Sequence, residues 1–296
     1  MSKLVGVLYH PRIEEARTLS VALKDVLEQK GYQVWAASAW EEKNAKDLLP
    51  GTQAVVSIGG DGTIMRAARI IIPATAPILG IRYGRLGFLA ELDPADALAR
   101  VPAILERPPR TDLRSMLQAT CMSTLLDPSL NEKHYPLMAG NGDSSLHALN
   151  DIAVARGSAG RPINVTVTID GQLYATYRTD GVILSTATGS TAYSFSAGGP
   201  VLHPTSEDFV LTPVSPQATF NNALVLRSTS MVQLMVTSDH GAILSIDGQI
   251  DVPLEDGETV TVQKSPYHVS FLRASAQDSF YGELLARLRF GENLGL

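Results

Sequence analysis

The chain has 296 residues, of which 45% are hydrophobic, so it can bury a substantial core, and its length suits two domains better than one. A formal net charge of −6 gives no broad positive surface for nucleic acid or for an anionic membrane. Cys121 is the only cysteine, which excludes an internal disulfide and a site of four cysteine ligands.

The N-terminal part of the chain alternates short apolar runs with segments of helical spacing. Residues 13–32 predict a helix that ends at Gly31. Strands that alternate with helices favour right-handed crossovers and a parallel sheet. We therefore expect residues 1–112 to form an α/β, Rossmann-like domain. Strands are predicted for residues 3–10, 33–38, 54–59 and 77–82.

Two features of the N-terminal region predict a cytoplasmic protein. The chain reaches Pro11, Arg12 and two glutamates before an apolar signal region can form. The longest apolar stretch, residues 70–81, is too short to span a bilayer and contains two prolines.

Beyond residues 106–112 the hydrophobic pattern changes to a period of two. Residues 163–170 place apolar and polar side chains on opposite faces, as a half-buried strand does. Residues 113–275 are therefore expected to form a mainly antiparallel, sandwich-like β domain, in which residues 124–146 are a polar connection. Asp-Gly pairs predict tight hairpins at 170–171, 247–248 and 256–257.

The C-terminal residues 276–296 return to helical spacing. Apolar side chains recur within residues 279–290, at Tyr281, Leu284, Leu285 and Leu288. We expect this helical segment to pack back on the first domain.

The stretch VVSIGGDGTIMRAAR, residues 55–69, carries the first candidate site. Gly59 and Gly60 follow a predicted strand, where α/β sheets collect ligands and where bare backbone can approach a phosphate. Thr63 can cap the following helix, which Pro73 stops. Asp61 is either a base that takes a proton from an acceptor hydroxyl, a ligand of Mg²⁺, or a turn residue bonded to its own backbone.

Arg66 and Arg69 lie on the helix after this turn. Arg66, one turn in, is the better candidate to face the phosphates of a donor, and a solvated helix face is the commoner use of such a residue. No Walker A pattern is present. The six histidines have no metal-ligand spacing, so we expect no protein-bound metal site.

A second constellation lies in the β region. Asn150 and Asp151 open a strand and can bind ribose hydroxyls or an adenine edge, although such a pair is more often a simple turn. Residues 185–200 consist of Gly, Ala, Ser and Thr apart from Tyr193, Phe195 and the closing proline. That composition is typical of a nucleotide pocket wall with an aromatic surface for a ring, and a flexible glycine-serine loop is the alternative.

These segments resemble the ATP-dependent NAD kinases, which phosphorylate the 2′-hydroxyl of the adenosine ribose of NAD to form NADP. The resemblance runs through most of the chain. GGDGT alone is shared with lipid kinases and, more distantly, phosphofructokinases, whereas the long run at 179–200 is far more specific. The similar segments are GGDGT (59–63), GRLGFLAEL (84–92), LNDIAVARG (149–157), TDGVILSTATGSTAYSFSAGGP (179–200) and DGQ (247–249).

The resemblance implies a substrate cleft between an α/β and a β-sandwich-like domain, a homodimer or homotetramer, and Mg²⁺ or another divalent cation with ATP. In that scheme Asp61 is the catalytic base, and Gly60 and Gly62 lie near phosphate. Gly59, Thr63 and Arg66 are assigned to the ATP phosphates. The adenosine part is expected at Phe88, Asn150, Thr191, Ala192 and Ser196, the second nucleoside at Asp151 and Tyr193, and the nicotinamide end of a neighbouring chain's ligand at Asp180.

Four departures from the family pattern are visible. Ala187 stands where the family usually has Pro, Asp151 where it often has Glu, and Arg82 where Asn is common. Residues 213–226 lack the histidine and arginine usual in the family version of that segment. Arg82 adds a charge near the expected cleft, so we expect it to affect phosphate handling or donor choice.

Two other functions fit parts of the same pattern. A lipid kinase with a diacylglycerol or sphingoid acceptor shares GGDGT, but it would be expected to carry a basic amphipathic stretch, and we find no convincing one. A non-catalytic dinucleotide sensor would use the same cleft without needing a base at Asp61.

Overall fold

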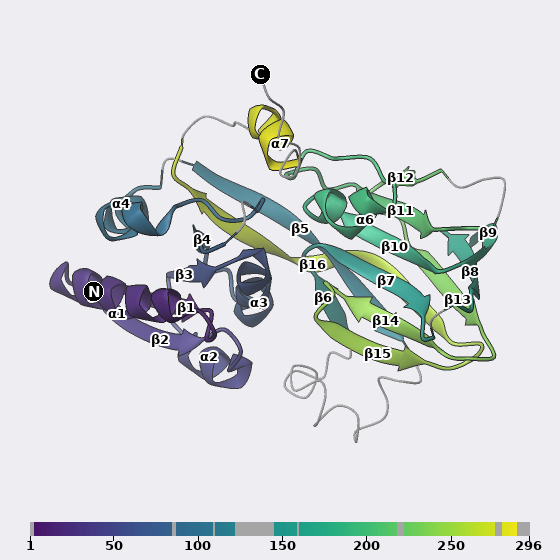
Figure 1. The fold of residues 1–296 in the computed structure, drawn as a ribbon, viewed down its shortest axis with the longest axis horizontal. Helices are drawn as coiled ribbons and strands as arrows, with labels where there is room; N and C mark the ends of the chain where they lie inside the picture. The colour runs from purple at the N-terminus through teal and green to yellow at the C-terminus, as the bar shows by residue number, and fades with distance from the viewer. Residues whose placement is uncertain are drawn as a thin grey trace. The chain divides into compact units, whose positions relative to one another are not determined.

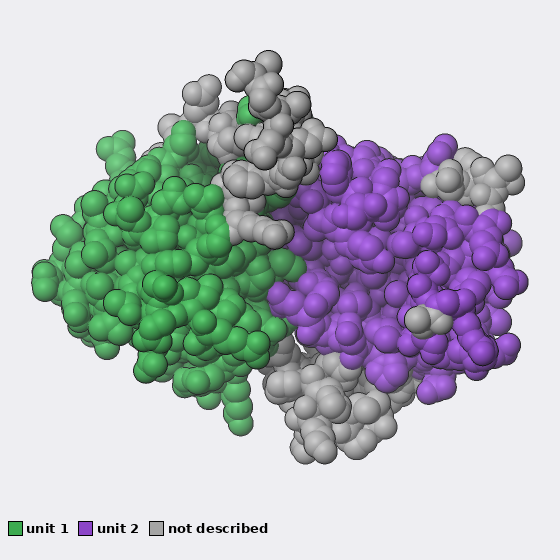
Figure 2. All heavy atoms as spheres, viewed as in Figure 1, with its two compact units in different colours: residues 1–113, 269–296 green, residues 114–268 purple. Residues whose placement is uncertain are grey.

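The structure is a computed structural model, and it describes residues 3–84, 87–108, 110–121, 145–158, 160–217, 222–275 and 280–288. The chain divides into two compact units, one formed by residues 1–113 and 269–296 and the other by residues 114–268. Figure 2 colours the first unit green and the second purple. In the described part of the chain, no helix combines the length and the apolar character needed to cross a membrane.

The first unit is an α/β domain with a parallel sheet, as predicted (Figure 1). Its strands lie in the order β2-β1-β3-β4, and every neighbouring pair is parallel. The helices form two layers, since α1 contacts α4 and α2 contacts α3. The elements are β1 (Leu4–Tyr9), α1 (Glu14–Gln29), β2 (Gln33–Ser38), α2 (Glu42–Leu48), β3 (Ala54–Gly59), α3 (Asp61–Ile71), β4 (Ile78–Arg82), α4 (Pro94–Glu106) and α7 (Phe280–Leu288).

The sequence explains why these elements form. In α1, the buried Leu19, Leu23 and Leu27 recur every four residues and face the sheet core. Gly31 follows the helix with a φ of +86°, which glycine adopts without strain, so the helix ends where predicted. The four strands are largely buried because helices cover both faces of a parallel sheet.

The second unit is built from antiparallel strands in two sheets, which also confirms the predicted class. One sheet has the order β12-β11-β10-β7-β14-β15. The other contains β16, β13, β8 and β9, with β5 paired to β16 and β6 to β5, and its β16 also pairs with β4 of the parallel strands. One hydrophobic core takes side chains from both sheets, as in a sandwich. The strands are β5 (Arg110–Cys121), β6 (Leu146–Ala148), β7 (Asp151–Arg156), β8 (Ile163–Ile169), β9 (Gln172–Thr179), β10 (Gly181–Thr186), β11 (Phe209–Val214), β12 (Leu224–Leu226), β13 (Val232–Thr237), β14 (Ala242–Ile246), β15 (Ile250–Leu254) and β16 (Thr259–Arg273).

Two of the three Asp-Gly pairs form the predicted hairpins. Asp170 and Gly171 join β8 to β9, and Asp247 and Gly248 join β14 to β15, with positive φ at all four residues. The third hairpin prediction is wrong. The turn at 256–257 connects β15 of one sheet to β16 of the other, because β15 pairs with β14 whereas β16 pairs with β13. An Asp-Gly pair predicts a reversal of the chain, but not whether its flanking strands pair.

The last part of the chain returns to the first unit. Phe271 near the end of β16 pairs in parallel with Ile78 of β4, and α7 belongs to the same unit. The expected helix over residues 279–290 is therefore confirmed over Phe280–Leu288. Except for Ser145 and Leu146, the expected polar connection at residues 124–146 lies outside the described residues.

Candidate active site

The glycine-rich turn lies at the carboxyl end of β3. This strand is buried along its whole length and ends at Gly59, and α3 begins at Asp61 with Gly60 as its extended N-cap residue. A side chain on Gly59 would place its Cβ 2.3 Å from the Thr63 hydroxyl oxygen, so this position requires glycine. The turn therefore brings bare backbone and the first N–H groups of a helix to the edge where parallel sheets bind ligands.

The predicted cap at Thr63 is wrong. The backbone N–H groups of Thr63 and Ile64 already donate to the Gly60 carbonyl oxygen at 2.9 and 3.2 Å, so the helix begins two residues before Thr63. Thr63 is the third residue of α3, and its buried hydroxyl oxygen has no hydrogen-bond partner among the described residues. None of these observations tests the assignment of Thr63 to the ATP phosphates, which stays a prediction.

The Asp61 carboxylate bonds to a distant part of the chain rather than to its own turn. Oδ2 accepts a hydrogen bond from the backbone N–H of Phe88 at 2.7 Å, and Oδ1 accepts one from Leu89 at 3.3 Å. A Cβ on Gly87 would lie 2.2 to 2.3 Å from the carboxylate atoms. Asp61 is half-buried, and its carboxylate contacts residues 87–89. The glycine at position 87 therefore makes room for the acid.

Arg287 on α7 supports the same segment. Its Nη1 donates to the Gly87 carbonyl oxygen at 2.8 Å, and its guanidinium lies 5.5 Å from the centre of the Phe88 ring. A guanidinium over an aromatic face is attractive, so Arg287 restrains both the backbone and the ring. Sequence reasoning missed this residue, because its helical spacing says nothing about the loop that it contacts.

The two arginines on α3 are paired with Glu42 of α2. Arg66 Nη1 lies 3.3 Å from Glu42 Oε1, and its guanidinium lies 4.5 Å from the centre of the Trp40 ring. Burial and the nearby Arg69 lower the pKa of Arg66. Arg69 donates to both oxygens of Glu42 and is itself buried. The expectation that Arg66 faces donor phosphates stays a prediction.

Arg82, a departure from the family pattern, also has an acidic partner. Its Nε donates to the Asp93 carboxylate at 3.0 Å, and Nη2 bonds to the same oxygen. The added positive charge is therefore largely compensated within the first unit.

The Asn150–Asp151 pair lies at the start of β7 in the second unit. The backbone N–H groups of Leu149, Asn150 and Asp151 all donate to the carboxylate of Asp247. Asp151 is 6% exposed, and this burial, reinforced by the negative charge of Asp247, raises its pKa to about 7. Asp151 therefore titrates near neutral pH instead of being permanently ionised.

The small-residue run packs against this pair through specific contacts. The Thr186 hydroxyl donates to the Leu149 carbonyl oxygen at 2.6 Å and accepts from the Gly189 N–H at 3.0 Å. A Cβ on Gly189 would lie 2.1 Å from the Asn150 carbonyl oxygen. Ser190 donates to the Ala187 carbonyl oxygen at 2.7 Å. These bonds favour the pocket-wall interpretation over a flexible glycine-serine loop.

The remaining predicted residues lie at the end of this run. Thr191 ends a short 3-10 helix (Gly189–Thr191), and Ala192 precedes the one-turn helix α6 (Tyr193–Ser196). Tyr193 is 44% exposed, and its contact with the second nucleoside stays a prediction. Asp180 lies between β9 and β10, and its Oδ1 is 2.8 Å from Arg156 Nε.

The structure thus places the predicted residues in two groups. The first unit holds Gly59, Gly60, Asp61, Gly62, Thr63, Arg66 and Phe88, and the second holds Asn150, Asp151, Asp180, Thr191, Ala192, Tyr193 and Ser196. Direct bonds between the predicted segments are those of Asp61 with Phe88 in the first unit and of Asn150 with the run that begins at Thr186 in the second, whereas Arg66 and Asp180 bond to Glu42 and Arg156.

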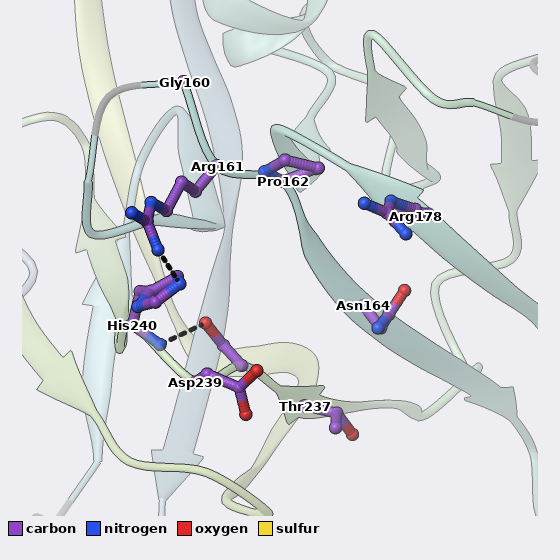
Figure 3. A pocket seen from close by; sticks show the side chains of 9 residues that line it. Gly160, Arg161, Pro162, Asn164, Arg178, Thr237, Asp239 and His240 are labelled. Atoms are coloured by element: carbon purple, nitrogen blue, oxygen red, sulfur yellow. Dashed lines mark hydrogen bonds between the residues drawn. The ribbon is translucent and has the colours of Figure 1, made fainter.

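A separate recess of about 450 Å³ lies at the ends of β8, β9 and β13 (Figure 3). His240 in its wall bonds to Arg161, and none of the predicted site residues lines it. The recess is lined by Gly160, Arg161, Pro162, Asn164, Arg178, Thr237, Ser238, Asp239 and His240.

Comparisons with known proteins cover both units. The family description "ATP-NAD kinase N-terminal domain" matches residues 5–108, and "ATP-NAD kinase C-terminal domain" matches residues 149–274. The chain is 39% identical over 289 residues to an NAD kinase of Dehalococcoides mccartyi, covering 98% of this chain and 97% of the relative. It is 34% identical over 290 residues to an NAD kinase of Chloroflexus aurantiacus, covering 98% and 99%.

The chain is also similar to solved structures of kinases of this kind. The chain resembles an NAD kinase from Archaeoglobus fulgidus in complex with ATP, with a TM-score of 0.72, 26% identity and coverage of 97% of this chain and 98% of that one. A yeast NADH kinase complexed with NADH shares the fold, with a TM-score of 0.76, 23% identity and coverage of 100% and 89%. Fold and site thus define a phosphotransferase. The chain belongs to the NAD kinase family.

Proposed function

We propose that this enzyme transfers the γ-phosphoryl group of ATP to the 2′-hydroxyl of the adenosine ribose of NAD, with Asp61 as the catalytic base. The observation that carries this proposal is the Asp61 carboxylate at the N-terminus of α3, held by the N–H groups of Phe88 and Leu89. A lipid acceptor is not favoured, because both halves of the chain match NAD kinases.

In the proposed reaction the ribose 2′-oxygen forms a bond to the γ-phosphorus. The bond between that phosphorus and the bridging oxygen breaks, and ADP leaves with the electron pair. The proton of the hydroxyl passes to the Asp61 carboxylate. In phosphoryl transfer the protein chiefly positions the reacting groups and stabilises negative charge. Here the fixed carboxylate can orient the hydroxyl, and the N–H groups at the start of α3 can stabilise the phosphate charge.

The predicted substrate contacts divide between the two groups of residues. Gly59, Gly60, Gly62 and the first turn of α3 are proposed to face phosphates, because helix N–H groups favour anions there. Phe88, Asn150, Thr191, Ala192 and Ser196 are proposed to hold the adenosine part, and Asp151 and Tyr193 the second nucleoside. Asp180 is proposed to reach the nicotinamide end of a neighbouring chain's ligand, a role that depends on the homodimer or homotetramer that we also propose.

The donor is proposed to be ATP with bound Mg²⁺ or another divalent cation. Among the described residues, no group of three or more His, Cys, Asp and Glu side chains forms a ready metal cage. The cation is proposed to be held mainly by the donor phosphates and water, as Mg²⁺ commonly is. We further propose a cytoplasmic location.

An assay of NADP formation tests the proposal. The purified chain is incubated with ATP and Mg²⁺ and with NAD, NADH or diacylglycerol, and each product is separated and quantified. NADP from NAD is the expected product. Binding of NAD by calorimetry without any phosphorylated product would instead identify a dinucleotide sensor, and a phosphorylated lipid would identify a lipid kinase. Light scattering gives the oligomeric state.

A further inference from the structure

We propose that Asp247 is a positioning residue for the dinucleotide, because its carboxylate fixes the backbone that carries Asn150 and Asp151. This inference rests on the proposed function, since it concerns the residues assigned there to NAD. Asp247 lies in the β14–β15 hairpin, about a hundred residues further along the chain than the pair that it holds.

The contact consists of three hydrogen bonds to one carboxylate. Oδ1 accepts from the N–H groups of Asn150 at 2.7 Å and Asp151 at 3.0 Å, and Oδ2 accepts from Leu149 at 3.0 Å. Three successive backbone donors aimed at one acid form an anion-binding concavity, here filled by the protein itself. The bond is also reciprocated, because the Asp247 N–H donates to the Asp151 carbonyl oxygen at 2.9 Å.

Asp247, which carries this carboxylate, has a left-handed backbone conformation in the hairpin turn. Asp247 has a φ of +54° and Gly248 a φ of +60°, so both central residues of the turn are left-handed. Asp, Asn and Gly tolerate that conformation better than other residues do. The turn thus restricts position 247 to residues that tolerate a left-handed conformation. The three N–H bonds further require a side chain that can accept them.

The held backbone in turn carries the wall of the predicted pocket. The Asn150 carbonyl oxygen accepts from the Thr186 N–H at 2.8 Å and sits against Gly189, where no Cβ would fit. A shift of Asn150 would therefore disturb the small-residue run that leads to Thr191 and Ala192. In this way Asp247 acts on two parts of the proposed NAD site.

The surroundings of Asp247 and Asp151 also differ in how they affect a negative charge. Asp247 receives three N–H donors, which stabilise an ionised carboxylate, whereas Asp151 is buried and has a pKa raised to about 7. The three hydrogen bonds thus favour the charged form of Asp247, whereas burial disfavours the charged form of Asp151.

The chain contains a matched control in the other Asp-Gly hairpin. Asp170 has a φ of +50° and precedes Gly171, and its carboxylate likewise accepts a backbone bond, from Met231 at 2.8 Å, and one from Ser230 at 3.1 Å. Those partners belong to the β12–β13 connection and include no predicted site residue. Asp170→Asn therefore reproduces the turn chemistry without touching the Asn150 backbone.

The test compares Asp247→Asn with Asp170→Asn. Asparagine keeps the left-handed turn but replaces one acceptor oxygen by an NH₂ group, which cannot accept the N–H bonds. For Asp247→Asn we expect the KM for NAD to rise at least about tenfold while the KM for ATP stays within about twofold. Asp170→Asn should leave both KM values within about twofold.

Hydrogen exchange supplies a direct structural measurement. In Asp247→Asn, the amides of residues 149–151 should exchange faster than in the wild type, whereas Asp170→Asn should leave them unchanged. Should Asp247→Asn fail to fold, Asp247→Glu keeps the charge but displaces it by one methylene, and the same rise in the KM for NAD is expected.

The outcomes separate this inference from the proposed function. Absence of NADP formation by the wild type would count against the proposed function itself. An active wild type with equal KM values for NAD in Asp247→Asn and Asp170→Asn, or with unchanged exchange at residues 149–151, would overturn the role of Asp247.

Discussion

The carboxylate of Asp61 accepts a hydrogen bond from the backbone N–H of Phe88 at 2.7 Å. The bond joins the glycine-rich turn after β3 to the segment that follows β4, two stretches that the sequence marks as separate motifs. Because a carboxylate that accepts two N–H bonds is fixed in direction, Asp61 is preorganised before any substrate arrives.

Replacing this acid tests its chemical role. Asp61→Asn removes the group that we propose takes the proton, so we expect kcat for NADP formation to fall by about 10² to 10⁴ while NAD still binds. The amide oxygen can keep the bond from Phe88, which limits the structural effect. Calorimetry measures NAD binding and a coupled assay measures kcat. Turnover equal to that of the wild type would remove Asp61 from the mechanism.

Gly87 offers a second way to disturb the same acid without changing it. In Gly87→Ala, the new Cβ would lie 2.2 to 2.3 Å from the Asp61 carboxylate atoms, and the end of a side chain moves more easily than backbone does. We therefore expect kcat to fall at least about tenfold, because a displaced Asp61 would lose the alignment with the reacting group that its proposed role as base requires.

A matched substitution separates this effect from general damage. A Cβ on Gly282 in α7 would meet no heavy atom within 4 Å, so Gly282→Ala should leave kcat unchanged and, as a helix substitution, slightly raise the melting temperature. Equal kcat values for Gly87→Ala and the wild type would contradict the contact between Gly87 and Asp61.

The local elements and the motif positions were predictable from the sequence, whereas their cross-contacts were not. Alternating apolar runs and Gly31 predicted β1, α1 and the parallel sheet correctly, because period and turn residues are local properties. The hairpin predicted from the third Asp-Gly pair, at 256–257, was wrong. Because β15 pairs with β14 and β16 with β13, this turn joins two sheets, and a local turn signal cannot identify the partners of its flanking strands.

Three side-chain partnerships also lay beyond sequence reasoning. Arg287 reaches Gly87, Glu42 binds Arg66, and Asp247 holds Asn150, each across a long sequence separation. Residue spacing gives no information about such contacts, because they depend on how the sheets bring the segments together. The Asp-Gly pair at 247–248 was visible only as a turn and a family motif.

Glu42 is expected to be important for stability, because it is the shared partner of two arginines. Its side chain is 12% exposed, and that of Arg69 is 9% exposed. Glu42→Ala would leave a buried guanidinium without this counter-charge, which costs about 3–5 kcal/mol in the free energy of unfolding. Urea unfolding monitored by circular dichroism measures the loss.

An exposed ion pair provides the comparison for Glu42. Glu28 lies 3.7 Å from Lys24 one helical turn away, and both side chains are more than 40% exposed. Glu28→Ala should therefore change the free energy of unfolding by at most about 0.5 kcal/mol. If the two alanine variants unfold at the same urea concentration, the Glu42 pairs contribute no more than a surface pair does.

The raised pKa of Asp151 predicts a pH-dependent stability. In the folded protein this pKa is about 7, whereas an aspartate in the unfolded chain has the ordinary pKa of 3.8; the rise comes mainly from burial and secondarily from Asp247. Between these values the folded state binds more protons than the unfolded state, so the contribution is complete below pH 3.8 and is lost as the pH rises through 7.

Asp151→Asn removes this titration and keeps the side-chain size. The free energy of unfolding of the variant minus that of the wild type should therefore increase from pH 4.5 to pH 8, by at most about 4 kcal/mol, since one pKa unit corresponds to about 1.36 kcal/mol. Taking the difference between the two proteins cancels the other titrating groups. Chemical unfolding at four or five pH values measures it, and a difference that stays constant across this range would show that burial does not hold Asp151 in its protonated form.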